Sequence, residues 1–316
     1  MYYLGIDLGG TNIAVGVVNE KFEIVKKGST PTLAHRSAEE IIKDMGALCV
    51  RLMEEVGITA EEVAYAGIAS PGSVDPANGV LVYANNLPFK NFAICDTLKK
   101  YCPVERVYLE NDANAAALGE AMGGAAKGAK LSLMITLGTG LGGGVILDGK
   151  VYSGFNFAGA ELGHTVIEYD GAPCTCGRKG CWEAYSSATA LVRMTKEKMS
   201  ACADTLMWEL CGGDLAKASA RTAFDAAKKG DKVGAEVVDT YIKYLACGVT
   251  NMINIFQPNV LSIGGGVCNE GDYLLKPLCA IVEKDQYTRD QAVKTKICIA
   301  ELGNDAGIVG AAALGV

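Results

Sequence analysis

Residues 2–18 read YYLGIDLGGTNIAVGVV, and this stretch decides the fold. Two apolar segments, residues 2–7 and 13–18, flank a glycine turn, which is the pattern of two strands joined by a tight turn. The plan recurs in residues 131–147, LSLMITLGTGLGGGVIL, where we expect strands over residues 131–137 and 145–147 around a second glycine turn. A strand–turn–strand unit that occurs twice suggests a duplicated domain architecture.

Strands alternate with helices along the rest of the chain. Apolar residues at helical spacing predict helices over residues 38–56 and 233–256, and small residues predict two more over residues 113–122 and 307–314. Short apolar runs predict strands over residues 22–26, 63–69, 104–109 and 260–263, with a Gly/Pro/Asn-rich loop leading up to Pro88. This alternation is typical of α/β proteins. We place the boundary between two α/β domains near residue 118.

Composition excludes several functional classes. The 316-residue chain has a formal net charge of −7, which argues against a nucleic-acid partner. Its longest uncharged run, residues 244–269, is interrupted by Asn, Gln and Pro, so we expect no membrane span. The chain opens without a basic and apolar leader, and its 12 cysteines are more typical of reduced thiols than of the disulfide frameworks of short secreted chains. We therefore expect a cytoplasmic protein.

Three glycine turns suggest a nucleotide site. Each follows an apolar strand: Gly9-Gly10-Thr11-Asn12, Gly138-Thr139-Gly140 and Gly264-Gly265-Gly266. Backbone N–H groups at such turns approach phosphate closely because no Cβ intervenes. Asp7 lies just before the first turn, where a carboxylate can hold Mg²⁺ directly or through water, and Thr11 and Asn12 add neutral donors. One such turn is equally typical of a plain hairpin, but three fit a nucleotide clasped between two domains.

Two competing nucleotide motifs do not apply. The chain contains no G-x-x-x-x-G-K-[ST] sequence, which excludes a P-loop enzyme. Residues 138–143 do match G-x-G-x-x-G, but the dinucleotide-binding fold needs a helix after the glycines. Here we expect a strand and a turn instead, so we interpret the match as accidental.

Asp112 is the candidate catalytic base. It lies in Glu110-Asn111-Asp112-Ala113-Asn114, between the end of a strand and an alanine-rich helix. A helix N-terminus stabilises an ionised carboxylate, and phosphoryl transfer uses a carboxylate to accept the proton of the attacking hydroxyl. The alternative interpretation is that Asp112 caps the helix, which is compatible with a role as base.

One histidine and three cysteines form a candidate zinc site. Cys174, Cys176 and Cys181 lie close together, and His164, one of only 2 histidines, precedes them by ten residues. This donor set is that of a tetrahedral Cys₃His zinc site. Four protein ligands would close the site, so we expect a structural rather than a hydrolytic role. The alternative is a set of unliganded thiols.

Seven motifs spread along the chain carry a family resemblance: Asp7-Leu8-Gly9-Gly10-Thr11, Ser70-Pro71-Gly72, residues 110–114 (ENDAN), 137–144 (LGTGLGGG), 159–164 (GAELGH), 174–183 (CTCGRKGCWE) and 263–267 (IGGGV). With them the chain resembles the ROK family (repressors, open reading frames and sugar kinases), and most closely its glucokinase-type members. The resemblance implies an actin/hexokinase/Hsp70-like fold with two ribonuclease-H-like domains and an interdomain cleft. These would be residues 1–118 and residues 119–302, the second with the zinc knuckle, while a helix at about residues 303–316 packs back on the first.

The resemblance also implies roles for individual residues. Asp112 matches the catalytic base and contacts the substrate. The sugar-hydroxyl ligands would be Asn86, Asn111, Glu161, His164 and Glu183, and His164 would bind zinc through one ring nitrogen and face the sugar with the other. Gly9, Gly10, Thr11, Gly138 and Thr139 match phosphate-loop positions, beside Asp7, Asn12 and Gly140, and Gly264 and Gly265 match the adenosine side. Many members have a Trp near Asn86, where this chain has Phe89-Lys90.

The expected function is transfer of the γ-phosphoryl group of ATP to the 6-hydroxyl of glucose, with Mg²⁺ and a structural Zn²⁺. Kinases for mannose, fructose, allose, N-acetylmannosamine or N-acetylglucosamine remain alternatives. So do a sugar-sensing repressor and a nucleotide-driven protein like actin. The family's repressors carry a DNA-binding region before the first strand, which here starts at residue 2, and an actin-like protein has no sugar to hold. The resemblance favours a homodimer or a pair of dimers.

Overall fold

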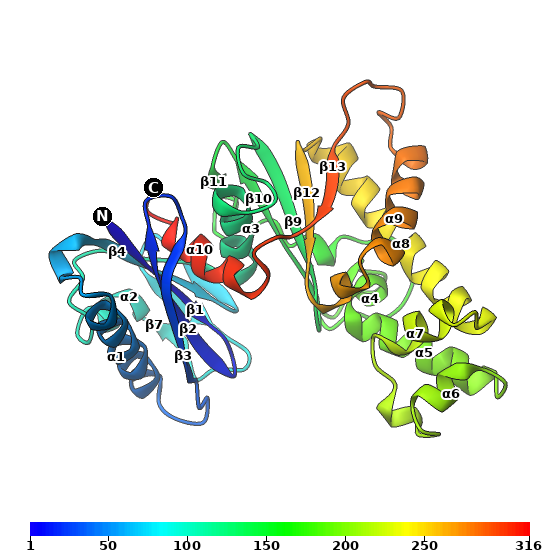
Figure 1. The fold of residues 1–316 in the computed structure, drawn as a ribbon, viewed down its shortest axis with the longest axis horizontal. Coiled ribbons are helices and arrows are strands. Elements are labelled where there is room, and N and C mark those ends of the chain that lie inside the picture. The colour runs from blue at the N-terminus through cyan, green and yellow to red at the C-terminus, as the bar shows by residue number, and fades with distance from the viewer. The chain divides into compact units, whose positions relative to one another are not determined.

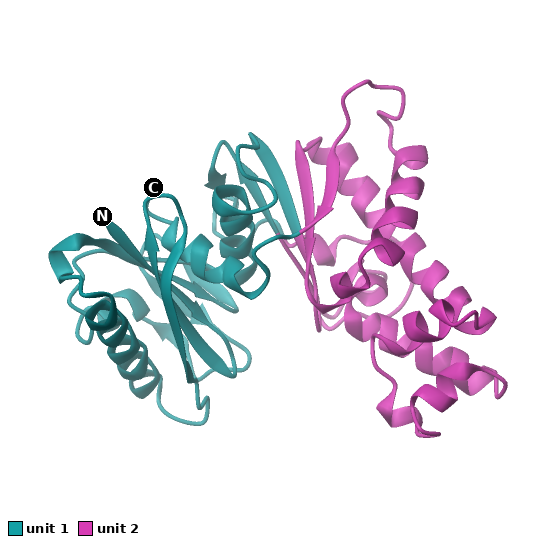
Figure 2. Cartoon of the chain, viewed as in Figure 1, with its two compact units in different colours: residues 1–134, 144–160, 300–316 teal, residues 135–143, 161–299 magenta.

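The computed structural model describes all residues, 1–316, and they form two compact units (Figure 2). Unit 1 contains residues 1–134, 144–160 and 300–316, and unit 2 contains residues 135–143 and 161–299. The two units alternate along the chain, so they do not meet at one position in the sequence. The domain boundary near residue 118 therefore stays a prediction.

Unit 1 is built on a five-stranded sheet with the order β3-β2-β1-β4-β8 (Figure 1). Its strands are β1 (Tyr2–Leu8), β2 (Asn12–Asn19), β3 (Ile24–Pro31), β4 (Val63–Ser70) and β8 (Val107–Asn111). The first three are antiparallel neighbours, and β4 and β8 join β1 in parallel. The predicted strands are therefore confirmed, with two shifted bounds. The third begins at Ile24 because Phe22 sits in a turn with φ 62°, and the strand predicted at residues 104–109 begins three residues later.

Alternation along β1 assigns its two faces to two different helices. Leu4, Ile6 and Leu8 are fully buried in a core shared with α1 (Ala38–Val56). On the other face, a Cβ at Gly5 would meet the carbonyl oxygen of Ile308 at 2.0 Å, so a side chain there would displace α10 (Ala306–Ala312). The period of 2 along the strand thus places one helix on each face (Figure 1).

The long helix α1 has the predicted bounds, and its ends carry clear signals. Ser37 and Glu40 form a capping box at the start, and Gly57 ends the helix with φ 79°. Both devices satisfy backbone groups that a helix end leaves unpaired. The apolar stripe of α1, which includes Ile41, Met45, Leu48 and Leu52, is buried against the sheet.

A small second sheet replaces the loop expected up to Pro88. Its strands β5 (Ser73–Asp75), β6 (Val80–Tyr83) and β7 (Lys90–Phe92) are antiparallel, and α2 (Ile94–Leu98) follows; the short helix η1 (Ala60–Glu62) precedes β4. The glycines and asparagines mark tight turns between very short strands. In the first of these turns Asn78 N–H donates to the Asp75 carboxylate at 3.2 Å. Strands of three or four residues give almost no periodic signal, which explains why a loop was predicted in place of β5 and β6.

The last helix of the chain completes unit 1. α10 packs on α3 (Asp112–Gly123) and on β1 and β4, and all seven of its residues are buried. A Cβ at Gly310 would lie 1.6 Å from the carbonyl oxygen of Ala115 in α3, so only glycine permits this approach. η5 (Gly303–Asp305) leads into α10.

The remaining large sheet has the order β11-β10-β9-β12-β13. Its strands are β9 (Leu131–Leu137), β10 (Leu141–Leu147), β11 (Lys150–Val151), β12 (Val260–Gly264) and β13 (Lys296–Ile299). Both five-stranded sheets therefore place a strand pair joined by a glycine turn beside later strands, which confirms the duplicated α/β architecture. Because β10 follows the second glycine turn directly, the accidental nature of the G-x-G-x-x-G match is also confirmed.

The helical part of unit 2 surrounds α8 (Lys232–Phe256), which was predicted within one residue. The other elements are η2 (Leu162–His164), α4 (Glu183–Ser186), α5 (Ala188–Ala201), α6 (Leu206–Leu210), η3 (Leu215–Lys217), α7 (Thr222–Lys228), η4 (Gly266–Glu270) and α9 (Asp272–Asp285). No helix in the structure has both the length and the apolar character needed to cross a membrane.

Candidate active site

Thr32 donates two hydrogen bonds to the first glycine turn, which lies between β1 and β2. The Thr32 hydroxyl donates to the carbonyl of Gly9 at 2.7 Å, and the Thr32 N–H donates to the carbonyl of Thr11 at 2.8 Å. The N–H groups of Gly10 and Thr11 donate to no group of the chain, and no atom lies within 4 Å of where a Cβ of Gly10 would be. The turn therefore offers free donors and open space, as an anion-binding turn requires.

Two carboxylates, Asp7 and Asp112, interact electrostatically in unit 1. Burial, reinforced by the negative charge of Asp112, raises the pKa of Asp7 to about 6. Burial also raises the pKa of Asp112, although a hydrogen bond from the Ala113 N–H acts in the opposite direction. Two partly buried carboxylates that repel each other are a suitable donor set for a divalent cation such as Mg²⁺.

The cap of α3 is Asn111 rather than Asp112, which corrects the capping interpretation. The Asn111 carbonyl oxygen Oδ1 accepts from the N–H groups of Ala113 at 2.9 Å and Asn114 at 3.3 Å, while its Nδ2 donates to the carbonyl of Gly72 at 3.2 Å. Asp112 is the first helical residue, and its Oδ1 accepts from the Ala113 N–H at 2.9 Å. The Asn111 side chain also hydrogen-bonds the Asp112 carboxylate and, like the Ala113 N–H, lowers its pKa. In its ionised form this carboxylate can accept a proton.

Asn86 lies in an exposed turn between β6 and β7, and Gly72 links this region to α3. Gly72 has φ 93°, and a Cβ there would lie 2.1 Å from the carbonyl oxygen of Tyr83. Because Asn111 holds Gly72, the start of α3 and the end of β6 are fixed to the same turn. The Tyr83 hydroxyl also donates to Asn85 at 3.1 Å, next to Asn86.

The second glycine turn, between β9 and β10, is held by residues that follow α4. The Ala188 N–H donates to the carbonyl of Gly138 at 2.8 Å, and the Thr189 hydroxyl donates to the carbonyl of Thr139 at 2.7 Å. As in the first turn, two N–H groups, those of Thr139 and Gly140, donate to no group of the chain. Both turns thus present a pair of free backbone donors.

Glu183 joins this turn to the cysteine loop. Its Oε2 accepts from the Leu141 N–H at 3.0 Å, and its Oε1 accepts from the Thr175 hydroxyl at 3.2 Å. The same Oε1 lies 3.6 Å from the Cys174 sulfur. A carboxylate held from two sides in this way has a fixed orientation, as a ligand for sugar hydroxyls requires.

Glu161 precedes η2 and His164 is its last residue, and η2 packs on β10. A Cβ at Gly163 would lie 2.1 Å from the carbonyl oxygen of Leu141. The helix η2 therefore lies directly against Leu141, the first residue of β10, which follows the second glycine turn. Nδ1 of His164 faces the Cys174 sulfur at 3.6 Å. The other ring nitrogen, Nε2, is therefore directed away from the cysteines.

The four predicted zinc ligands do come together. One ligand atom each of His164, Cys174, Cys176 and Cys181 lies within 4.8 Å of all the others. Tetrahedral Zn²⁺ separates two sulfur ligands by about 3.8 Å and a sulfur from a nitrogen by about 3.6 Å. The structure has 3.7 Å between the sulfurs of Cys176 and Cys181, and 3.6 Å between Cys174 and His164. The residues present therefore fit a structural zinc ion.

The third glycine turn lies at the end of β12. Gly265 has φ 94°, and a Cβ there would lie 2.4 Å from the carbonyl oxygen of Leu137, so this position requires glycine. Gly264 and Gly265 are thus packed on the strand that leads to the second turn. Their role toward adenosine stays a prediction.

Sequence reasoning missed Thr32 and Glu110 as supporting residues. Thr32 is fully buried beneath the first turn, and Glu110 accepts from the Asn111 N–H at 2.8 Å and from Nδ2 of Asn114 at 3.1 Å. Glu110 stands inside a quoted motif, so its position was a usable signal. Thr32 follows a polar strand and has no local signal at all.

Comparison with known proteins identifies this class of architecture. A structure described as a ROK family glucokinase from Streptomyces griseus in complex with glucose and AMPPNP superimposes with a TM-score of 0.80, at 33% identity and with 99% of each chain covered. The glucokinase of Thermotoga maritima is 39% identical over 313 residues, 98% of this chain and 96% of the relative. An N-acetyl-D-glucosamine kinase of Aliivibrio salmonicida is 31% identical over the full length of both. The fold is thus that of the actin/hexokinase-like sugar kinases.

The family model described as "ROK family" matches residues 3–315. The chain belongs to the ROK family, and the resemblance drawn from its motifs is confirmed.

Proposed function

We propose that the protein is a glucokinase that transfers the γ-phosphoryl group of ATP to the 6-hydroxyl of glucose. The observation that carries the proposal is the start of α3, where Asn111 supplies the helix cap, so that the carboxylate of Asp112 is not needed for capping. Relatives named glucokinase at up to 39% identity support the same substrate.

Asp112 would act as the general base. Its carboxylate would accept the proton of the attacking hydroxyl, while hydrogen bonds from the Ala113 N–H and the Asn111 side chain fix its orientation. Burial raises its pKa, which brings a carboxylate closer to the operating pH and makes it a stronger base. Asn111 would both cap α3 and contact a sugar hydroxyl with its side-chain amide.

ATP and Mg²⁺ would be held by groups of both glycine turns. The free N–H groups of Gly10, Thr11, Thr139 and Gly140 would bind phosphate oxygens, with Gly9, Asn12 and Gly138 shaping the turns and Gly264 and Gly265 facing adenosine. Asp7 would bind the cation directly or through water. When bound, the cation neutralises charge that develops on the phosphates.

Sugar recognition would rest on Glu161, His164 and Glu183 in unit 2 and on Asn86 and Asn111 in unit 1. Zinc on Nδ1 of His164 would fix the ring so that Nε2 faces a sugar hydroxyl. Carboxylates and amides that pair with hydroxyl groups discriminate strongly against analogues that lack them. A second candidate, phosphorylation of N-acetylglucosamine, is favoured by the full-length relative at 31% identity.

The compartment is proposed from the cysteines and the assembly from the family. All 12 cysteines are free thiols, which suits a reducing compartment, and we place the protein in the cytoplasm. The homodimer or pair of dimers expected from the family remains our proposal, and light scattering of the purified protein would measure it.

A coupled assay of ADP release tests the function. The purified protein receives Mg-ATP and, in separate reactions, glucose, mannose, fructose, allose, N-acetylglucosamine or N-acetylmannosamine. The largest kcat/KM is expected for glucose. A larger value for an N-acetylated sugar would retain the chemistry and change the substrate. No turnover with any sugar, while ATP and glucose still bind, would contradict a kinase and favour a sugar sensor.

A further inference from the structure

The short helix α4 connects the cysteine loop to the second glycine turn. The candidate zinc ligand Cys181 lies two residues before α4, and the helix begins with Glu183, the proposed sugar ligand. After α4, the Ala188 N–H donates to the carbonyl of Gly138 at 2.8 Å. A helix of four residues is unstable in isolation, so contacts with the rest of unit 2 must hold α4 in place.

Trp182 immediately precedes α4 and is fully buried against α8. A Cβ at Gly248 of α8 would lie 1.9 Å from Cε2 and 2.4 Å from Nε1 of the indole, so the ring occupies the place of a side chain there. Only glycine at this position allows so close an approach. The indole N–H is buried and donates to no group of the chain, so packing rather than a hydrogen bond orients the ring.

Two further contacts follow along the same side of α8. The rings of Tyr185 and Tyr244 have their centroids 4.4 Å apart, and the Tyr241 hydroxyl donates to the carbonyl of Ser186 at 2.7 Å. Residues later in α4 therefore contact residues earlier in α8, so the two helices run in opposite directions. These two contacts hold the end of α4, and Trp182 holds its beginning.

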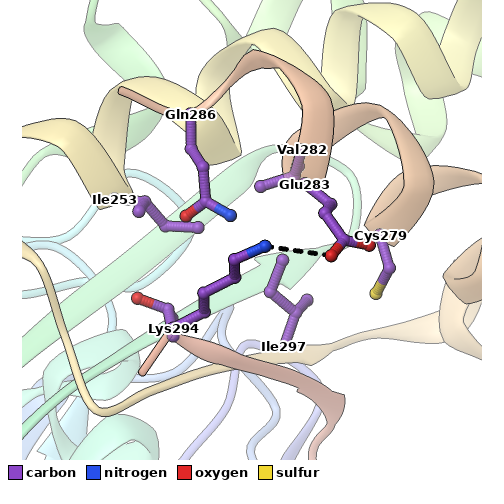
Figure 3. A pocket seen from close by; sticks show the side chains of 8 residues that line it. Ile253, Cys279, Val282, Glu283, Gln286, Lys294 and Ile297 are labelled. Carbon is purple, nitrogen blue, oxygen red and sulfur yellow. Dashed lines mark hydrogen bonds and ion pairs between the residues drawn. The ribbon is translucent and has the colours of Figure 1, made fainter. Parts of the chain in front are cut away.

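The helix α8 presents a different side to α9 and β13. There Ile253 lines a pocket that is partly open, and the only lysine in its lining, Lys294, pairs with Glu283 at 3.0 Å (Figure 3). Gly248 precedes Ile253 by five residues, a spacing that places the two on different sides of a helix. Crowding at Gly248 is therefore expected to act on α4 and not on this pocket.

We propose that Trp182 is a positioning residue: its packing on Gly248 sets the Glu183 carboxylate and, through it, the second glycine turn. Trp182 is bonded to Cys181 on one side and to Glu183 on the other, so a shift of the indole moves both neighbours. Oε2 of Glu183 accepts from the Leu141 N–H at 3.0 Å, and such a shift weakens this bond. The effect on sugar binding rests on the proposed function, whereas the effect on the turn does not.

The test crowds the indole and then relieves the crowding. Gly248→Ala should raise the KM for glucose about fivefold or more with a smaller change in kcat, and speed amide hydrogen exchange at Leu141 about tenfold. Leucine is smaller and more flexible than tryptophan, so adding Trp182→Leu should recover most of both losses. Gly234→Ala is the matched control. It crowds α7 from the same helix, because a Cβ there would lie 2.8 Å from that of Ala226, and both readouts should stay within about twofold of the wild type.

Fluorescence gives a readout that does not depend on turnover. The chain has two tryptophans, so Trp182 is the only one left in a Trp208→Phe background. Its emission should shift to the red and its quenching by acrylamide should rise in Gly248→Ala, but not in Gly234→Ala. If Gly248→Ala does not fold, Trp182→Phe replaces it, because it leaves room beside Gly248 without adding bulk and should also speed exchange at Leu141 severalfold.

Two results would overturn the proposal whether or not glucose is the substrate. One is unchanged exchange at Leu141 in a folded variant with the crowded or truncated ring. The other is an equal gain in exchange in Gly248→Ala with and without Trp182→Leu, because α8 and not the indole would then be responsible. If exchange changes as expected while the wild type phosphorylates no sugar, the positioning role stands and the proposed function fails.

Discussion

The turn between β1 and β2 is supported by Thr32 alone among side chains, whereas the turn between β9 and β10 is supported by the Thr189 hydroxyl and, in addition, by the Glu183 carboxylate, which also reaches the cysteine loop. Both turns leave two backbone donors free. The difference lies in what each support is connected to. The hydroxyl and N–H of Thr32 both donate to the first turn, while Glu183 connects the second turn to Thr175 and Cys174. Duplication supplied a turn with two free backbone donors twice, and only the second copy is connected to a candidate metal site.

The largest effect is expected for Asp112, the proposed base, whose charge raises the pKa of Asp7 beside the first turn. Asp112→Asn should lower kcat by about 10²–10⁴-fold, because the base is lost, while glucose affinity changes less than about tenfold. Steady-state kinetics and calorimetric glucose binding measure the two quantities. Asp96→Asn, an exposed acid in α2, is the matched control. Loss of glucose binding in Asp112→Asn would remove its assignment as base.

Removal of a metal ligand should affect the second turn alone. Cys176→Ser should abolish stoichiometric zinc and lower activity about 10–100-fold, because His164 and the loop around Glu183 lose their support. Metal analysis gives the zinc content, and hydrogen exchange should rise around residues 138–141 but not around residues 9–12. Cys202→Ser, which alters a thiol outside the cluster, is the control. Full activity in zinc-free protein would contradict the structural role.

Replacing the two supports compares the turns directly. Glu183→Gln removes the charge and leaves one acceptor oxygen for two donors, the Leu141 N–H and the Thr175 hydroxyl, so kcat/KM should fall about tenfold or more, through both glucose and ATP. Thr32→Val removes one hydrogen bond beneath the first turn and should raise the KM for ATP about fivefold, with little change in the KM for glucose. Equal effects of Thr32→Val on both substrates would show that the first turn is not specific to the nucleotide.

The smallest effect concerns stability and should be favourable. The pKa of Asp7 is about 6 in the folded protein against 3.8 for an ordinary Asp, so the fold disfavours the ionised form. In metal-free protein, Asp7→Asn should therefore be more stable by about 1–3 kcal/mol above pH 6. The gain should shrink as the pH falls and vanish below about pH 4, where Asp7 is neutral in both states. Denaturant unfolding at several pH values measures this, and a gain independent of pH would exclude the charge as its cause.

Local patterns in the sequence were sufficient for the elements with strong periodicity. The α1 helix was predicted with its observed bounds because its apolar stripe, the Ser37 cap and Gly57 all agree. The strands around the first glycine turn were equally clear, whereas β10 begins at Leu141, four residues before the predicted strand, because residues 142–144 belong to the strand and not to the turn. The short strands β5 to β7 gave no such signal, since three residues cannot establish a period.

The candidate site was harder to predict wherever it depends on contacts between distant residues. The four zinc ligands were predicted because their donor atoms and close spacing are diagnostic, and the structure does gather them. The sequence offered Asp112 as the possible cap of α3 and the cap is Asn111, because both residue types favour that position. The contacts from Thr32 to Gly9 and from Glu183 to Leu141 span 23 and 42 residues, and no local pattern reveals them.

The position of α10 has a consequence for how the protein is made. Unit 1 needs residues 306–312 to cover one face of β1 and β4 and to pack on α3. During synthesis, that face must stay uncovered until nearly the whole chain has left the ribosome, while the core of unit 2 is already complete. Contacts between chain ends slow folding, because a long loop must close first. The second half of the chain is therefore expected to reach its native structure before the first.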